Sequence, residues 1–407
     1  MTPALLLVAL ASPALAGDFI LATGPEVELR NSGTWARAIA TSDGWRLAHA
    51  SNGDFYIASL TKTGDGLGDW EMDRDSRVQL TQHGELKDHA IRRCPDGSYL
   101  HVASANVAEP NDSAYGWRYS ADFEVLAQAP IEEANSARAH NDMALYCSAL
   151  GAGVAFGGQG GPPAILSIDA DLNAEVAREL AFDVRPTGAG FWVDAEAELI
   201  SLFYTDFTGN LHKLDMDASL NQVATMNRPI AEESLRAYWP QGVLRVGDYW
   251  LIAHMVRPQQ TSVGGDDGNV RLVVVDDQLQ IQDEALLTDN PIEEAGMRPW
   301  LARQGDLVLM SYDRQRQHTV LEIRLDLDAF GVDPDEDTGW DGSDGWGGSS
   351  GGGSGGNSAG DTASDEDDDG SGKDGCGGCA APGSVPASVP AGLLASLALL
   401  TIVRRRT

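Results

Sequence analysis

The sequence predicts an all-β protein, a β-propeller with six blades, and two observations favour this fold. The first is a phrase that recurs along the chain: an alternating apolar run, one or two aspartates that fit a turn, and a large apolar residue. Its closing Phe or Leu stands at positions 123, 172, 220, 279 and 330, which gives steps of 49, 48, 59 and 51 residues. A strand-rich repeat of about fifty residues is typical of propeller blades, and the aspartates then form the turn between a blade's outer strands.

The second observation is a hairpin that precedes each phrase. Residues 90–102 show it best, with an Asp-Gly turn between two apolar strands. Six such units match residues 18–332, and the strand from Asp18 to Leu21 is expected to help close the ring. Rings of five or seven blades and a pair of β-sandwiches are the alternatives. The other hairpins are at residues 39–47, 243–251 and 301–309 and, with weaker turns, near Leu150 and Ala195.

The first 16 residues are expected to be a signal peptide. A short apolar stretch ends at Ala14-Leu15-Ala16, which fits the small residues before a signal peptidase cut, although no Lys or Arg precedes Arg30. An apolar first strand is the alternative. The exported propeller domain is therefore expected to occupy residues 17–332.

The chain is strongly acidic, with a formal net charge of -33 and a pI of about 4.3. This excludes nucleic acid as a partner, because phosphate binding needs a basic face. Residues 333–375 hold 13 Asp or Glu and one Lys among Gly and Ser, which predicts a disordered linker. No cofactor is expected. Ca²⁺ is only a weak prospect at residues 365–369 or at the Asp266-Asp267 pair, because neither has the spaced ligands of a calcium loop.

The last 32 residues, 376–407, have three parts. Cys376 and Cys379 are followed by an apolar helix at about 385–403, long enough to cross a bilayer, and then by three arginines that mark its cytoplasmic end. This order resembles the MYXO-CTERM sorting signal. The resemblance implies a stay in the inner membrane, cleavage by a sorting protease near the cysteines, possible lipidation there, and display at the cell surface. A permanent anchor and a redox-active cysteine pair are the alternatives.

Cys94 and Cys147 lie at matching places in consecutive units, at the end of the first hairpin strand. Inner strands of neighbouring blades are close enough for a disulfide, which an exported protein can form. Two buried free thiols are the alternative.

Candidate site residues follow from the geometry of a propeller, since the starts of the inner strands and the ends of the second strands share one face around the channel. Aromatic, charged and polar side chains gather there, as a polar or sugar-like ligand requires. The main candidates to bind the ligand are Arg37, His89, Asn141, Trp239, Arg298 and Trp300. The other residues on this face are Trp35, Tyr238, His49, Asp206, His254, Arg257, Asp313 and Arg314.

The leading hypothesis is a surface-displayed propeller that binds a glycan, peptide or protein on this channel face. The alternative is a secreted glycoside hydrolase with Asp88 and Asp142 as its carboxylate pair. His140 is a further catalytic candidate, either as a base or as a metal ligand together with Asp88 or His89 of the neighbouring blade. No sialidase-type Ser-x-Asp box accompanies the arginines, and no sequence-local motif predicts a metal site. A third reading gives these polar residues a structural role inside the channel of a passive surface component.

Overall fold

The computed structural model describes residues 18–32, 34–41, 43–51, 53–81, 86–105, 114–131, 143–156, 164–179, 188–206, 209–230, 235–258, 268–291, 296–314 and 317–333. The chain divides into two units, Met1–Gly351 and Gly352–Thr407, and all described residues lie in the first. The segments predicted as a signal peptide, as a linker beyond Asp333 and as a sorting tail with Cys376 and Cys379 therefore lie outside the described residues. Within the described residues, no helix is long and apolar enough to cross a membrane.

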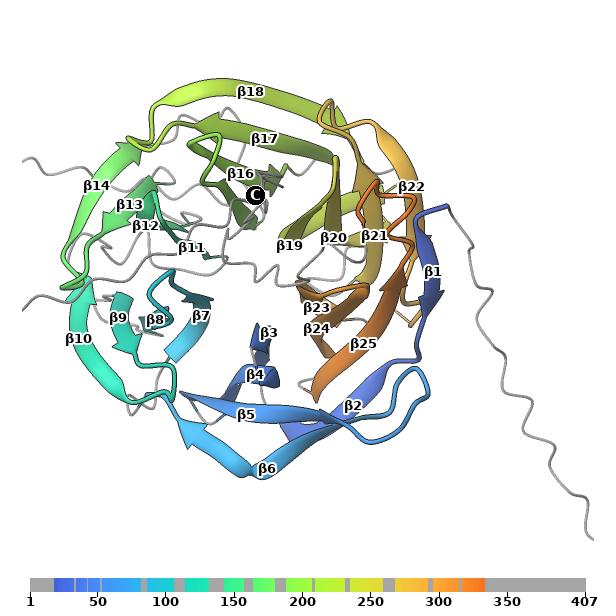
Figure 1. Cartoon of the computed structure of the whole chain (residues 1–407), viewed down its shortest axis with the longest axis horizontal. Coiled ribbons are helices and arrows are strands. Elements are labelled where there is room, and N and C mark those ends of the chain that lie inside the picture. The colour runs from blue at the N-terminus through green and yellow to red at the C-terminus, as the bar shows by residue number, and fades with distance from the viewer. Residues whose placement is uncertain are drawn as a thin grey trace, which may run out of the picture. The chain divides into compact units, whose positions relative to one another are not determined.

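The described residues form six antiparallel sheets arranged around a central axis (Figure 1), so the six-bladed propeller is confirmed. Five blades consist of four consecutive strands each. Blade 1 comprises β3 (Thr34–Thr41), β4 (Gly44–Ser51), β5 (Asp54–Lys62) and β6 (Trp70–Gln79). Blade 2 comprises β7 (Leu86–Arg93), β8 (Tyr99–Ala105), β9 (Ala114–Tyr119) and β10 (Val125–Ile131). Blade 3 comprises β11 (Ala144–Ser148), β12 (Gly151–Phe156), β13 (Ala164–Ile168) and β14 (Ala174–Glu179).

Blade 4 comprises β15 (Ala189–Asp194), β16 (Leu199–Thr205), β17 (Asn210–Met216) and β18 (Gln222–Pro229). Blade 5 comprises β19 (Leu235–Val246), β20 (Tyr249–Pro258), β21 (Asn269–Val275) and β22 (Ile281–Leu286). Blade 6 contains β23 (Gly296–Gln304), β24 (Leu307–Arg314) and β25 (Gln317–Leu325). Its outer strands come from the other end of the chain, because β1 (Ile20–Thr23) and β2 (Val27–Ser32) both pair with β25. The N-terminal segment therefore closes the ring, as the sequence predicted.

In blades 2 to 5 the recurring phrase is a turn between the third and fourth strands, as predicted. In blades 3, 4 and 5 the first aspartate of the turn accepts hydrogen bonds from backbone N–H groups two and four residues later. In blades 2 to 5 the closing Leu or Phe does not begin the next strand but lies within the turn, at a φ of 56–67°. Bulky side chains rarely adopt this left-handed backbone. The residues in this conformation are Phe123, Leu172, Leu220 and Leu279.

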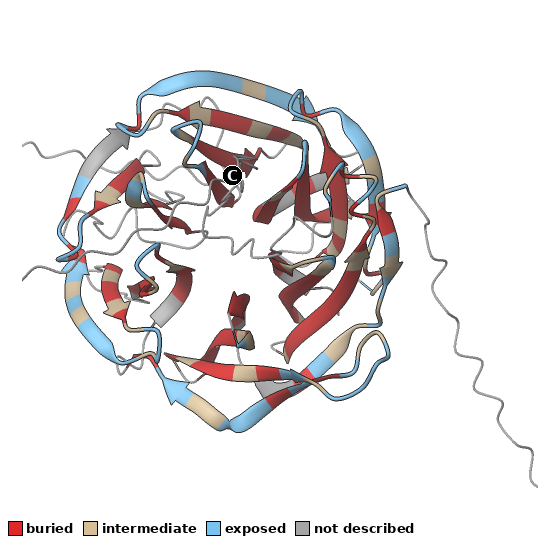
Figure 2. Ribbon diagram, viewed as in Figure 1, coloured by how far each residue is buried: buried red, intermediate tan, exposed pale blue. Residues whose placement is uncertain are grey.

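The core consists of hydrophobic clusters that join neighbouring blades. Leu172 packs with residues of blades 2 and 3, Leu220 with blades 3 and 4, and Leu279 with blades 4 and 5. Each of these three turns thus inserts a buried leucine side chain between its own blade and the preceding one. Figure 2 shows the result: inner strands are buried, whereas the outer strands β10, β18 and β22 are largely exposed.

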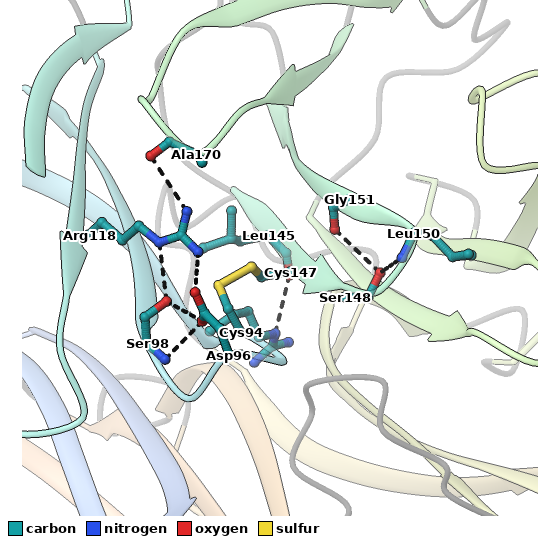
Figure 3. Close-up of a disulfide and its surroundings, with 11 residues drawn as sticks. Cys94, Asp96, Ser98, Arg118, Leu145, Cys147, Ser148, Leu150, Gly151 and Ala170 are labelled. Atoms are coloured by element: carbon teal, nitrogen blue, oxygen red, sulfur yellow. Dashed lines mark hydrogen bonds and ion pairs between the residues drawn. A yellow bond between two sulfur atoms is a disulfide. The ribbon is translucent and has the colours of Figure 1, made fainter. Parts of the chain in front are cut away.

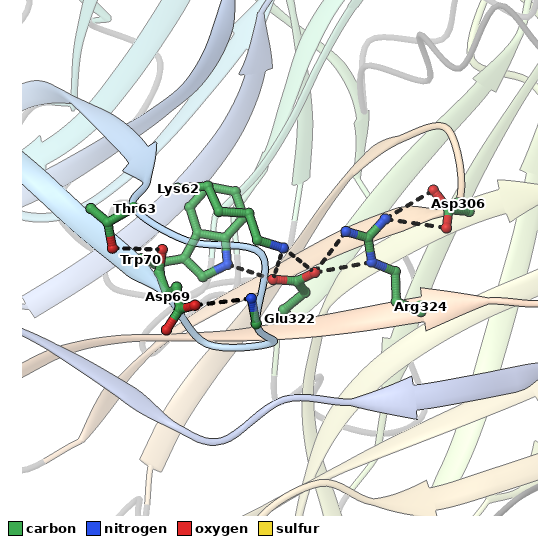
Figure 4. A network of polar contacts seen from close by, with 8 residues as sticks. Lys62, Thr63, Asp69, Trp70, Asp306, Glu322 and Arg324 are labelled. Carbon is green, nitrogen blue, oxygen red and sulfur yellow. Dashed lines mark hydrogen bonds and ion pairs between the residues drawn. The ribbon is translucent and has the colours of Figure 1, made fainter.

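A buried carboxylate links blade 6 to blade 1 at the closure of the ring (Figure 4). Glu322 is fully buried and accepts hydrogen bonds from Lys62 Nζ, at 2.8 and 2.9 Å, and from Trp70 Nε1, at 2.8 Å. Arg324 also pairs with Glu322, and its guanidinium reaches Asp306 as well. Burial alone would raise the pKa of Glu322, but the hydrogen bonds from Lys62 and Trp70 hold it below its ordinary value.

Candidate ligand site at the channel

The inner strands are bulged at the end where the sequence places the candidate site. Register shifts interrupt β3 between Thr34 and Arg37, β19 between Tyr238 and Gly242, and β23 between Met297 and Trp300. A further shift interrupts β7 between Leu86 and Asp88. The extra residues include Trp35, Gln241 and Arg298 on blades 1, 5 and 6. Bulges redirect side chains and are frequent beside functional sites.

Two of these bulged residues carry strained backbone. Trp35 has a φ of 62° and Arg298 a φ of 59°, a region that large side chains occupy only when the surroundings impose it. The pair is also in contact, since the Arg298 guanidinium lies 3.9 Å from the centroid of the Trp35 ring. Strain at matching positions of two adjacent blades marks this end of the channel as specialised.

Arg37 connects the three bulges. It is fully buried, its Nη2 donates to Oε1 of Gln241 at 2.9 Å, and its Nη1 donates to the carbonyl oxygen of Arg298 at 3.2 Å. We call Trp35, Arg37, Gln241 and Arg298 the channel cluster. It joins blades 1, 5 and 6 through side chains, although the inner strands that carry them are far apart in the sequence.

Trp300 extends this arrangement to blade 2. The Arg37 and Arg92 guanidinium groups lie over its ring, at 4.9 and 3.8 Å from the centroid, and its Nε1 donates to the carbonyl of Ala38. Arg92 Nε donates to the carbonyl of Leu145 in blade 3. The side chain of Trp300 is 1 % exposed, so it forms part of the packed interior rather than an open aromatic surface.

The channel cluster is rich in hydrogen-bond donors. Trp35 Nε1 and Gln241 Nε2 are buried and have no acceptor among the residues that the structure describes. A buried donor without an acceptor costs about 1–3 kcal/mol. Donors in this state, beside arginines, suit a ligand that brings acceptor oxygens.

The contacts of Asp88 indicate a structural role. It is fully buried, its Oδ1 accepts from the His89 N–H at 2.7 Å, and its Oδ2 accepts from the Met143 N–H at 3.3 Å in the next blade. Its Oδ1 is also 3.7 Å from Arg37 Nη2. A carboxylate that joins two blades in this way has little freedom to act as a general acid or nucleophile.

Asp313 has a similar role at the junction of blades 6 and 1. Its carboxylate accepts from the N–H groups of Trp35 and Ala36 at 2.6 and 3.1 Å, which supports the bulge in β3. Asp206 lies in the turn after β16, where it accepts from Asn210 and pairs with His212 at 2.9 Å. Both residues were predicted on the channel face, and both stabilise backbone.

The histidines of this region are buried and neutral. His89 Nδ1 lies 3.1 Å from His101 Nε2, and His89 Nε2 lies 2.8 Å from the carbonyl of Trp35. Burial lowers the pKa of His101 to about 3 and that of His254 to about 4. Burial, with help from His318 and Arg77, also depresses the pKa of His49. At neutral pH these histidines are therefore uncharged and contribute to the packing of the interior.

Several predicted site residues cannot be compared with the structure. His140, Asn141 and Asp142, and the Asp266-Asp267 pair, lie outside the described residues, as do the side chains of Tyr238 and Trp239. Arg257 is half-buried at the end of β20. Arg314 pairs with Glu26 of the N-terminal segment at 3.3 Å. Of the six main ligand candidates, Arg37, His89, Arg298 and Trp300 are gathered at one end of the channel.

Gln241 and Arg92 were not among the predicted residues. Gln241 directly follows Tyr238-Trp239-Pro240, and a polar residue after a proline inside an apolar strand is a sign of a bulge. Arg92 lies in the inner strand β7. A charged side chain is unexpected there unless it reaches a partner in another blade.

Cys94 and Cys147 form a disulfide between blades 2 and 3, with Cα atoms 5.0 Å apart (Figure 3). Beside it, Arg118 pairs with Asp96 at 2.7 Å and donates to Ser98. Within the described ranges, no group of three or more His, Cys, Asp or Glu side chains is arranged to hold a metal ion.

No protein-family model matches the chain, and no curated protein matches it. Solved structures that resemble it include a member of the DUF4221 family from Bacteroides vulgatus, with 7 % identity, 75 % of this chain and 97 % of that chain covered, and a TM-score of 0.48. SapL1 lectin in complex with α-methyl fucoside has 10 % identity, coverages of 69 % and 88 %, and a TM-score of 0.46. An endo-arabinase from Bacteroides thetaiotaomicron has 12 % identity, coverages of 60 % and 94 %, and a TM-score of 0.40. At these scores the likenesses carry no argument about function.

Proposed function

We propose that the protein is exported, displayed at the cell surface, and binds a glycan, peptide or protein on the channel face without catalysing a reaction. The observation that carries this proposal is the channel cluster. Three adjacent blades carry bulges at matching positions, and two of the bulged residues have strained backbone. The fold maintains this strain at the place where the buried Trp35 Nε1 and Gln241 Nε2 have no acceptor among the described residues.

Binding is favoured over hydrolysis by the contacts of Asp88. Both of its oxygens accept backbone hydrogen bonds, and Arg37 lies beside them. A glycosidase needs an acid whose proton can reach the leaving oxygen, and a second carboxylate about 5–10 Å away. A fully buried carboxylate between two blades is poorly suited to that work.

Export is supported by the Cys94–Cys147 disulfide. Such bonds persist in oxidising compartments and are rare in the cytosol. Together with the expected signal peptide and sorting tail, this favours a protein that crosses the inner membrane. N-terminal sequencing of the protein from its native host is expected to give Gly17 as the first residue, and surface proteolysis of intact cells is expected to remove it. An intact Met1 in a cytosolic fraction would refute this part.

The binding proposal is tested with the purified protein on glycan and peptide arrays, alongside a screen for polysaccharide hydrolysis. We expect retained ligands and no released sugar. Arg298→Ala is expected to weaken binding by about tenfold or more, because it removes the cation over Trp35. Arg303→Ala is the matched control: it is also a buried arginine of β23, but it donates to the carbonyl of Gly305 at the opposite end of the strand. Release of reducing sugar, or equal loss in both variants, would contradict the proposal.

A further inference from the structure

A hollow lies between blades 1 and 2, at the end of the propeller opposite the channel cluster. Its volume is about 380 Å³, and its walls come from the β3–β4 turn, from β5 and β6, and from the turn that contains Phe123. This is within the range of small-ligand pockets, which hold about 300–1,000 Å³. We call it the inter-blade pocket.

An irregularity in β6 borders this pocket. Ile57 pairs with Val78 and Ser59 pairs with Asp73, so residues 74–77 of β6 together lie opposite Ala58. The backbone of β6 is pushed away there, and the Ser76 hydroxyl takes its place by accepting the N–H of Ser59 at 2.8 Å. A side chain that replaces a missing backbone partner shows that the bulge is part of the fold.

The opposite wall is aromatic. Phe123 is only partly buried, whereas Leu172, Leu220 and Leu279 at the equivalent turn positions are at most 4 % exposed. Its ring stacks on Tyr99 with centroids 4.6 Å apart and an interplanar angle of 28°. Val78 is 41 % exposed beside it. This turn thus presents an apolar surface where the others bury theirs.

The rim of the inter-blade pocket carries oriented polar groups of both signs. Arg46 donates to Asp43 at 2.7 Å and also to the Ser59 hydroxyl, yet its side chain stays 27 % exposed. A hydrogen bond from Thr41 is the main cause that lowers the pKa of Asp43, so Asp43 stays ionised. Arg93 and the exposed Asp122 also line the pocket.

We propose that the inter-blade pocket binds one or two units of a saccharide. A sugar ring has an apolar face that can stack on Phe123, and its hydroxyl groups both donate and accept, which matches paired arginines and carboxylates. The carboxylates at the rim disfavour a multiply charged anion. A wholly apolar ligand would leave the same groups unpaired. This site is separate from the channel cluster and adds a second binding surface to the proposed function.

The neighbouring groove between blades 2 and 3 provides matched controls. It holds a pocket of about 350 Å³ beside the disulfide, where Arg118 pairs with Asp96 as Arg46 pairs with Asp43, at 2.7 Å in both cases. Ala170 stands in its turn where Ala121 stands in the turn of Phe123, and both alanines are exposed. No aromatic side chain lines this second pocket within the described residues.

The test uses the full chain with a panel of neutral mono- and disaccharides, by saturation-transfer NMR and calorimetry, and then the corresponding polysaccharides. We expect a Kd on the order of 1 mM for at least one sugar. Ala121→Trp fills the mouth of the pocket from an exposed turn and breaks no hydrogen bond of a side chain. It is expected to weaken binding by about tenfold or more, as is Arg46→Ala, while Ala170→Trp and Arg118→Ala stay within about twofold of the parent.

The outcomes separate this site from the channel. Sugar binding that Ala121→Trp abolishes and Arg298→Ala leaves intact supports the inter-blade pocket, whatever the channel binds. Binding that only Arg298→Ala abolishes overturns the inference and favours the channel instead. An absence of binding to the whole panel at about 10 mM and to the polysaccharides also overturns it, as does equal loss in Ala121→Trp and Ala170→Trp. Polysaccharide binding without monosaccharide binding shows that the pocket takes a unit within a chain.

Discussion

The left-handed turns allow a prediction in which the usual order of two substitutions is reversed. Leu220 has a φ of 61° and is 4 % exposed, within the cluster between blades 3 and 4. Leu220→Ala loses a buried side chain, which costs about 3 kcal/mol, and keeps the strained backbone. Leu220→Gly loses the same packing but removes a backbone strain of about 1–2 kcal/mol, against a backbone entropy cost of about 0.4–1 kcal/mol.

The glycine variant is therefore expected to be the more stable one by about 0.5–1 kcal/mol. Leu214 is the control, because it belongs to the same cluster, is 6 % exposed and lies within β17. At Leu214 the order is expected to be normal, with glycine worse than alanine by about 0.5–1 kcal/mol. The difference between the two sites cancels the shared cost of lost packing.

Urea unfolding of the four variants, followed by tryptophan fluorescence, measures these free energies. A Leu220→Gly protein that is less stable than Leu220→Ala would refute the reasoning. It would mean that the turn is unstrained in solution, or that the cluster collapses differently around the two residues.

The remaining predictions concern the disulfide, the histidines and the ring closure. Replacing Cys94 and Cys147 by alanine opens a loop with a sequence separation of 53, and we expect a loss of about 4 kcal/mol by urea unfolding, with no loss relative to the parent in reductant. Burial lowers the pKa of His101 to about 3 in the folded protein, whereas its pKa in the unfolded chain is about 6.5. The contribution of His101 to the unfolding free energy is therefore constant above pH 6.5 and falls as the pH is lowered from 6.5 towards 3. We expect His101→Phe to reduce the slope of unfolding free energy against pH by about 1.4 kcal/mol per unit between pH 5 and 6, and an unchanged slope would contradict this. Deletion of residues 18–32 removes the outer strands of blade 6 and is expected to give a protein that aggregates through the exposed edge of β25, whereas a monomeric, equally stable product would show that the closure is dispensable.

The fold was predictable because its signals are local and repeated. The aspartate of each phrase favours a turn, as Asp169 and Asp217 show, and the spacing between the phrases indicates the number of blades. The prediction that β1 closes the ring also held, although β2 was not foreseen. The left-handed backbone of Leu172 was not predictable either, since leucine gives no sign of it and only packing between blades imposes it.

The site was predictable in position and less so in role. The rule for inner-strand starts found Arg37, Arg298 and Trp300, because the topology of a propeller fixes which residues face the channel. It could not tell that Asp88 accepts hydrogen bonds from two backbone groups, since this depends on how close the next blade approaches. The irregularity in β19 decides the direction of Gln241 in the same way: Pro240 indicates that a bulge is present, but not which side chain the bulge directs toward Arg37.

The closure of the ring also decides how the protein bears force. The described chain begins and ends in blade 6, where β1 and β2 flank β25 and the backbone N–H of Asp326 donates to the carbonyl of Phe19. A force applied between Asp18 and Asp333 therefore acts on the joint that is held by hydrogen bonds between the two ends of the described chain rather than by a covalent hairpin. The other five blades carry no tension until that joint opens, so the rate at which it opens sets how long the folded protein withstands such a force.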